Sequence, residues 1–84
     1  MVPKIKERLA YRKIAGELFI VDAAASRLHE LNGPAALIWE GLAAGKSEPR
    51  IVSDLLAEFE VSEKEARSDL REFIGELSES GLIL

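Results

Sequence analysis

Few side chains of this 84-residue chain are equipped for catalysis. It has no cysteine and one histidine, His29, which excludes a thiol nucleophile, a disulfide framework and thiolate or multi-histidine metal sites. Carboxylates for acid–base work would have to come from one flank of a helix expected at 62–79, which carries Glu65, Asp69, Glu72 and Glu76. Nothing around that flank predicts a pocket, so a solvated helix face is the expectation. We therefore expect no enzyme activity, no cofactor and no metal site.

Binding chemistry is better represented, first in a short alternating segment at 27–31. Arg27, Leu28, His29 and Glu30 would form the last strand of a small sheet, directly before a helix. The unpaired edge of such a strand offers backbone donors and acceptors to an added peptide strand. The alternative is an edge that its charges, Arg27 and Glu30, protect against unwanted pairing. The residues alone slightly favour the protected edge.

A second binding surface is predicted on the helix at 62–79. At 100° per residue, Ile74 lies beside Leu70 and is bordered by Arg67 and Arg71. Arginine stems cover apolar ligands while their guanidinium groups bind carboxylates, which would suit a peptide with apolar anchors and acidic residues. The alternative is a solvated face on which Arg67 pairs with Glu63, with Arg71 a repelling neighbour of Arg67.

The charge distribution argues against general nucleic-acid binding. Net charge is −4, but residues 1–13 hold five basic residues and one acidic residue, a net +4, whereas the rest of the chain is net −8. The basic arm is either a loosely held terminus or a clamp for an acidic partner. No segment has the ~20 apolar residues of a membrane span, and the first residues lack the apolar core of a signal peptide. We expect a cytoplasmic protein without membrane contact.

The elements that must position these residues change type near residue 32. Strands are expected at 9–14, 17–22 and 27–31, with Ala15-Gly16 as a tight turn, and the apolar run 18–21 marks the central strand. Helices are expected from Asn32 or Gly33 to Gly45, from Ser47 to Phe59, and from Ser62 to Gly81. Ser62 and Glu65 form a capping box. This order predicts an α+β, winged helix-turn-helix-like fold, in which a three-stranded antiparallel sheet is followed by three α-helices.

The apolar stripes predict which side of each helix faces the core. On the first helix Trp39 is expected in the core, while Ala36 and Leu37 fall outside the stripe, with Leu37 the better candidate for an exposed apolar contact. The tail from Leu82 should pack back or extend the sheet. The expected core residues of the three helices are Ala35, Ile38, Trp39 and Leu42; Ile51, Val52, Leu55, Leu56 and Phe59; and Ala66, Leu70, Phe73 and Leu77.

Two blocks of the sequence resemble the PqqD family. Residues 31–42, LNGPAALIWEGL, followed by Gly45, are similar to the family block LN-x-x-A-x-x-IW-x-x-L-x-x-G. Residues 66–77, ending in Gly81-Leu82, are similar to its closing block D-x-x-x-F-x-x-x-L-x-x-x-GL. The resemblance covers 9–84, which would form the domain, with 1–8 as a basic N-terminal arm. Residues 23–25, all alanine, replace a more typical turn.

The resemblance implies a non-catalytic peptide-binding adaptor. It would bind the leader of a ribosomally made precursor peptide by strand addition to the third strand, and present it to a radical S-adenosylmethionine enzyme or another modifying enzyme. Pyrroloquinoline quinone biosynthesis is one such setting. The implied peptide-binding residues are Arg27, Leu28, His29, Glu30, Arg67, Leu70, Arg71 and Ile74.

The alternative function is a winged-helix DNA-binding protein, because a fold does not fix a function. Its recognition helix would be residues 62–79, which hold three basic and six acidic residues. A helix of that sign is repelled by the phosphates that line a DNA groove. We therefore rank DNA binding second and expect no nucleic-acid partner.

Overall fold

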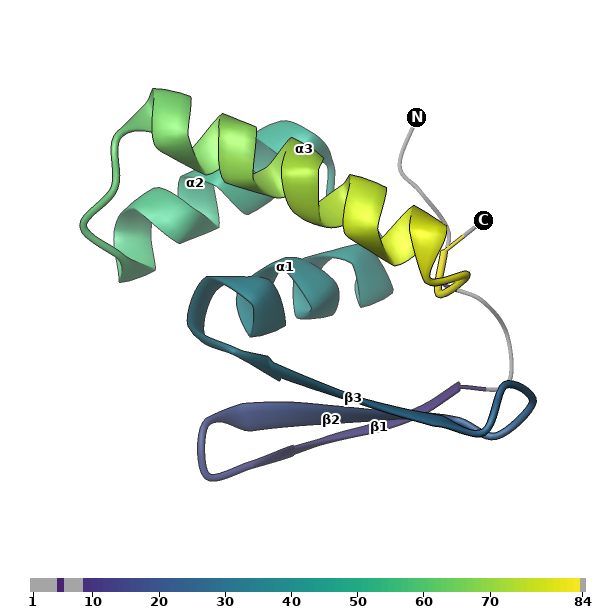
Figure 1. Cartoon of the computed structure of the whole chain (residues 1–84). Coiled ribbons are helices and arrows are strands. Elements are labelled where there is room, and N and C mark those ends of the chain that lie inside the picture. The colour runs from purple at the N-terminus through teal and green to yellow at the C-terminus, as the bar shows by residue number, and fades with distance from the viewer. Residues whose placement is uncertain (1–4, 6–8, 84) are drawn as a thin grey trace.

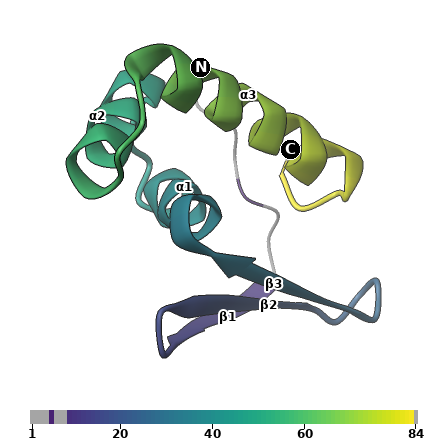
Figure 2. The same ribbon diagram turned by 60° about the vertical axis from the view of Figure 1, so that its left-hand side comes forward.

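The computed structural model describes residues 5 and 9–83, and it has the predicted α+β order. Strands β1 (Leu9–Ile14), β2 (Glu17–Asp22) and β3 (Arg27–Asn32) precede helices α1 (Gly33–Ala43), α2 (Glu48–Glu58) and α3 (Glu63–Glu79). The strands form one antiparallel sheet in the order β1-β2-β3, and the helices cover one face of it (Figures 1 and 2). The predicted basic arm, residues 1–8, lies outside the described residues except for Ile5.

Two turns shape the sheet. Ala15 and Gly16 both have positive φ, 52° and 83°, which matches the twist of a two-residue hairpin. Between β2 and β3 the alanine loop is held by its neighbours. The buried carboxylate of Asp22 accepts a hydrogen bond from the Ala25 backbone N–H at 3.2 Å, and Ser26 takes up a left-handed φ of 55°. Asp22 therefore supplies the turn chemistry that the alanines lack.

The central strand has one buried face. Leu18 and Ile20 point toward the helices and are fully buried, whereas Val21 on the other face is 46% exposed. The outer face of the sheet carries further exposed apolar side chains, among them Ile14 and Leu28. The helices thus cover a single layer of strands.

Serine caps start α2 and α3 as predicted. The Ser47 hydroxyl accepts a hydrogen bond from the Arg50 N–H at 3.3 Å. The Ser62 hydroxyl accepts one from the Glu65 N–H at 3.1 Å. The return contact of this capping box differs from the expectation, because the Ser62 hydroxyl itself donates to Glu65 Oε1 at 3.2 Å. Each cap satisfies a backbone donor that the first turn leaves unpaired.

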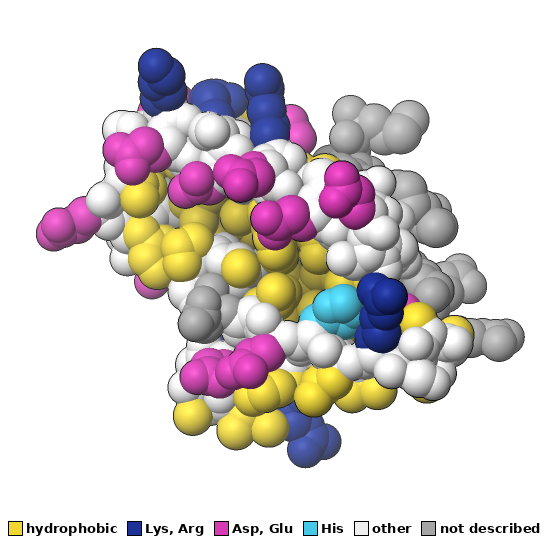
Figure 3. Space-filling view, viewed as in Figure 1, with side chains coloured by type: hydrophobic (Ala, Val, Ile, Leu, Met, Phe, Trp, Pro, Cys, Tyr) yellow, Lys and Arg dark blue, Asp and Glu magenta, His cyan; other side chains and the backbone are white. Residues whose placement is uncertain are grey.

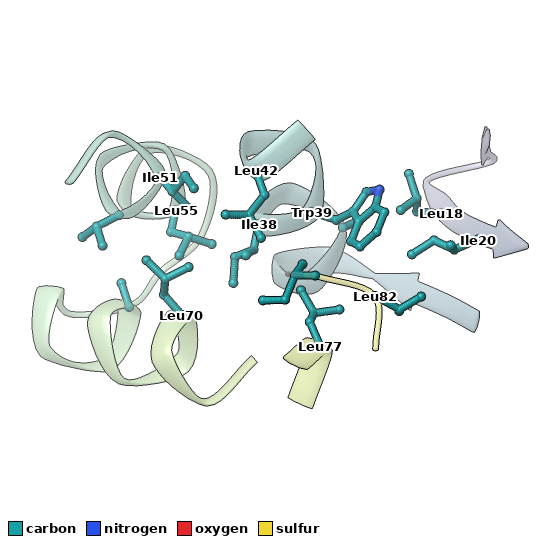
Figure 4. Packing of buried hydrophobic residues seen from close by; sticks show 14 residues of the cluster. Leu18, Ile20, Ile38, Trp39, Leu42, Ile51, Leu55, Leu70, Leu77 and Leu82 are labelled. Atoms are coloured by element: carbon teal, nitrogen blue, oxygen red, sulfur yellow. The ribbon is translucent and has the colours of Figure 1, made fainter. Parts of the chain in front are cut away.

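Trp39 occupies the centre of the core, as predicted, and is fully buried (Figure 4). Tyr11 of β1 packs edge-on against it, with ring centroids 5.6 Å apart and planes at 85°. The buried tail packs back through Ile83, which pairs with Ile5 and adds no strand to the sheet. The buried hydrophobic residues are Leu18, Ile20, Ala36, Ile38, Trp39, Leu42, Ile51, Val52, Leu55, Ala66, Leu70, Leu77, Leu82 and Ile83.

Some assignments to the core were wrong. Ala36, expected outside the stripe of α1, is buried, while Ala35 is half-buried. Leu56 is 39% exposed because α2 faces the core only through Ile51, Val52 and Leu55. Leu37, Phe59 and Phe73 are half-buried at the margin of the core. Within the described residues no helix is long and apolar enough to cross a membrane.

Candidate functional site

β3 is an edge strand with two distinct faces. It pairs only with β2 among the described strands, so its other edge has unpaired backbone groups. His29 lies opposite Ile20 in the register, and Leu31 lies opposite Leu18. Because Leu18 and Ile20 face the helices, Arg27, His29 and Leu31 do as well, since side chains alternate along a strand. Leu28 and Glu30 project from the outer face, where Leu28 is 67% exposed.

A cleft opens between α3 and the start of α1, which follows β3 directly. Its volume is about 200 Å³, and we call it the α1–α3 cleft. The α3 wall is mainly acidic, because three of its four lining residues are carboxylates and Phe73 is the one apolar side chain among them. The lining residues are Pro34, Ala35, Ile38, Asp69, Glu72, Phe73 and Glu76.

The space-filling view shows how the α1–α3 cleft continues toward β3. Acidic side chains follow the edge of α3 that faces the sheet, and apolar side chains form the hollow below them (Figure 3). The chain's one histidine lies at the opposite border of this hollow, beside a basic side chain. In both ribbon views α3 and β3 lie on opposite sides of α1 (Figures 1 and 2). A segment placed along β3 would therefore meet α3 across an apolar floor.

The α3 residues predicted to bind a peptide lie in the core or on another flank of the helix, away from the α1–α3 cleft. Leu70 is 2% exposed and belongs to the core, and Ile74 packs half-buried against it. Arg67 and Arg71 are exposed and lie about 160–200° around the helix axis from Asp69. Arg67 is paired with Glu63 at 3.3 Å, which is the pairing that the alternative interpretation described. These four residues are absent from the lining of the α1–α3 cleft.

A larger cleft, of about 650 Å³, lies between the β1–β2 turn, α1 and α2; we call it the α1–α2 cleft. Leu37 and Phe59 contribute its apolar surface, so the predicted role of Leu37 as an accessible apolar residue falls here. Four of its charged side chains are paired with one another. Lys13 contacts Glu40 at 3.3 Å, and a 2.8 Å hydrogen bond from Lys46 holds the pKa of Asp54 below its ordinary value.

β3 also contains an unsatisfied polar atom. His29 Nε2 is buried and has no hydrogen-bond partner among the described residues. The buried Trp39 Nε1 in the core likewise has no hydrogen-bond partner among the described residues, so an unpaired buried nitrogen does not by itself mark a binding site. The described part of the chain contains no group of three His, Cys, Asp or Glu side chains suited to a metal ion.

None of the seven cleft residues was predicted from the sequence to bind the peptide. The three acidic ones were expected on a solvated helix face, and Pro34, Ala35, Ile38 and Phe73 had no predicted binding role. Phe73 was assigned to the core because it shares a stripe with Leu70 and Leu77. Its position at the margin of that stripe, toward Asp69 and Glu76, was the available signal. Which flank of α3 meets the start of α1 depends on helix packing, which a single sequence does not encode locally.

Comparison with solved structures finds the same fold in two proteins bound to leader peptides. TbiB1 in complex with the TbiA(beta) leader peptide has a TM-score of 0.88 and 26% identity, covering 95% of this chain and 93% of that chain. Lasso peptide synthetase B1 complexed with the leader peptide has a TM-score of 0.90 and 24% identity, covering 100% and 99%. At that identity the second likeness concerns the fold alone.

Comparison at the level of sequence gives the family. No curated protein matches the chain significantly. The model of the family described as coenzyme PQQ synthesis protein D (PqqD) matches residues 17–83, which span β2, β3 and all three helices. This match agrees with the resemblance of the two sequence blocks, and it covers most of the chain. The chain therefore belongs to the PqqD family.

Proposed function

We propose that the chain is a non-catalytic adaptor that binds the leader segment of a ribosomally made precursor peptide. The observation that carries the proposal is the unpaired edge of β3 beside the apolar floor of the α1–α3 cleft. The edge offers main-chain hydrogen bonds to an added strand, and the cleft receives its side chains. A protein of the same fold, TbiB1, has been solved with a leader peptide, which supports this choice of ligand.

In this proposal the adaptor acts by proximity. It holds the leader so that the rest of the precursor meets a separate modifying enzyme at a raised effective concentration. A radical S-adenosylmethionine enzyme, in pyrroloquinoline quinone biosynthesis or a related pathway, is one such partner, and the cytoplasm is where ribosomes make the precursor. The chain's own residues fit a passive role, because it has neither a thiol nor a second histidine. An affinity of micromolar or better, roughly −8 kcal/mol, would sustain transfer.

Along β3 the proposed peptide-binding residues are Arg27 to Glu30, which contribute mainly through the backbone. On α3 the cleft geometry favours the flank of Phe73. The flank of Arg67, Arg71 and Ile74, with Leu70 beneath, remains the competing prediction from the sequence. Both flanks can be tested with the same peptide.

The test uses peptides selected from a randomised twelve-residue library on the immobilised full chain, with affinity measured by isothermal titration calorimetry. Two half-buried phenylalanines provide a matched pair, since Phe73 lines the α1–α3 cleft and Phe59 the α1–α2 cleft. Phe73→Ala should weaken binding fivefold to thirtyfold, about 1–2 kcal/mol, as for a buried interface anchor. Phe59→Ala should change affinity less than twofold. The reverse pattern, or a library without binders, would contradict the proposal.

A further inference from the structure

The α1–α3 cleft has a one-sided charge. Three of its seven lining residues, Asp69, Glu72 and Glu76, are acidic, and none is basic. All three carboxylates come from one flank of α3, and Figure 3 shows acidic side chains along the edge of α3 that faces the sheet. The exposed Arg67 and Arg71 lie toward the other flank of α3, and neither lines the cleft.

Among the described residues, no ion pair involves these carboxylates. The ion pairs of the described residues join Lys13 to Glu40, Lys46 and Arg50 to Asp54, and Arg67 to Glu63. Asp69, Glu72 and Glu76 take part in none of these four contacts. They therefore remain available to an incoming cation.

We infer that the peptide bound in this cleft carries lysine or arginine residues next to its apolar anchors. The inference rests on the proposed function and specifies its ligand. Phe73, Ala35 and Ile38 provide apolar contact for the anchor, while the carboxylates above them favour cationic neighbours. An acidic segment in the same place would bring like charges together and be rejected. The apolar floor and the free β3 edge define the site, and the carboxylates set its charge preference.

The charge of Arg27 predicts where along β3 the basic residues of the peptide lie. Arg27 is at the start of β3 and faces the helix side, opposite Asp22, whereas the cleft lies at the far end of β3, where α1 begins. The basic residues of the peptide should therefore lie at the α1 end, away from Arg27. The carboxylates also lie near the N-terminus of α1, which has no acidic residue in its own first turn. A competing role for these carboxylates is to stabilise that helix terminus. Measuring both thermal stability and peptide affinity distinguishes this role from attraction of a basic peptide.

The experiment compares two double variants with the same change in net charge. Glu72→Gln/Glu76→Gln alters the cleft, while Glu60→Gln/Glu79→Gln alters exposed carboxylates outside it. Because the two variants have the same net charge, the general attraction of an acidic protein for basic peptides is the same in both. The probes are a library-selected peptide, its copy with lysine and arginine replaced by norleucine, and its copy with them replaced by glutamate.

We expect lysine and arginine to be enriched among the selected peptides. The cleft variant should lose about fivefold in affinity for the basic peptide at low salt, and the control variant less than twofold. The wild type and the cleft variant should bind the norleucine copy with equal affinity. Of the three probes, the glutamate copy should have the lowest affinity for the wild type. Thermal melts of both variants accompany the titrations.

Three outcomes would overturn the inference. If binding of the selected peptides depends on Phe73 but the peptides are not enriched in lysine or arginine, the adaptor function stands and the charge preference is removed. A cleft variant that loses thermal stability but no affinity would assign the carboxylates to the α1 terminus. Binding that is insensitive to Phe73→Ala would show that the peptide does not occupy the α1–α3 cleft and would remove the charge preference, whereas a library without binders would remove the proposed function itself.

Discussion

Ile20 and His29 lie directly opposite each other across β2 and β3, and Ile20 is completely buried beneath the helices. This single pairing fixes the orientation of β3. His29 must share the helix side of the sheet with Ile20, while Glu30, one residue later, must face away. A one-residue slip would reverse both assignments. The two faces of the edge strand therefore have different surroundings.

The first prediction concerns those faces. His29→Ala removes a side chain from the helix side of β3 and should weaken binding of a library-selected peptide several-fold, about 1 kcal/mol. Glu30→Ala changes the outer face and should alter affinity less than twofold. Titration calorimetry on both variants checks this. Equal losses would show that the peptide does not distinguish the two faces.

The second prediction separates the two flanks of α3. Arg67→Gln/Arg71→Gln should change peptide affinity less than twofold, because these residues lie on the flank away from the α1–α3 cleft. Ile74→Ala should reduce the free energy of unfolding by about 1–2 kcal/mol as a half-buried residue, with little effect on affinity. Denaturant melts and titrations measure the two effects. A fivefold loss of affinity in either variant would favour the basic flank that the sequence suggested.

The third prediction concerns pH. The hydrogen bond and charge of Glu30 raise the pKa of Glu17 above its ordinary value of 4.5. A raised carboxyl pKa stabilises the fold below pH 4.5, and this contribution is lost as pH rises through the folded pKa. Glu17→Gln should therefore raise the melting temperature at pH 7 relative to wild type, and the advantage should shrink toward pH 4. A constant difference between pH 4 and pH 7 would show that the two carboxyls do not interact.

The fourth prediction uses two glycines inside helices. A Cβ on Gly41 of α1 would come within 2.7 Å of Ile51 Cγ1 on α2, whereas a Cβ on Gly75 of α3 would meet nothing within 4 Å. Gly41→Ala should destabilise the protein by about 1–3 kcal/mol through overpacking. Gly75→Ala should stabilise it by roughly 0.5–1 kcal/mol through helix propensity. Chemical denaturation of both variants measures the sign, and a stabilising Gly41→Ala would contradict the packing of α1 against α2.

Much of the fold could be predicted because its signals are local. The Ala15-Gly16 turn, the caps at Ser47 and Ser62 and the apolar run at 18–21 each act over a few residues. Asp22 was a local signal that went unused, although an aspartate before a loop is a turn former. Ala36 was misplaced because α1 meets both the sheet and α2, which buries more than one stripe.

The binding surface was harder to predict because it depends on how distant elements pack. The edge position of β3 follows from strand order and was expected. Which flank of α3 faces the cleft depends on how α3 packs across from the start of α1, where Phe73 and Pro34 line the same cleft. Helical periodicity gives two flanks around Leu70 and Leu77 and no reason to choose between them. The prediction chose the arginine flank because guanidinium groups bind carboxylates, whereas the cleft lies on the acidic flank.

The central claim is that a peptide adds to the edge of β3 over the α1–α3 cleft. The most direct measurement is amide chemical-shift mapping of the full chain by NMR during titration with a library-selected peptide. The largest changes are predicted in β3, residues 27–32, at the start of α1 and around Phe73. Changes concentrated instead around Lys13, Leu37 and Phe59, in the α1–α2 cleft, would contradict the account.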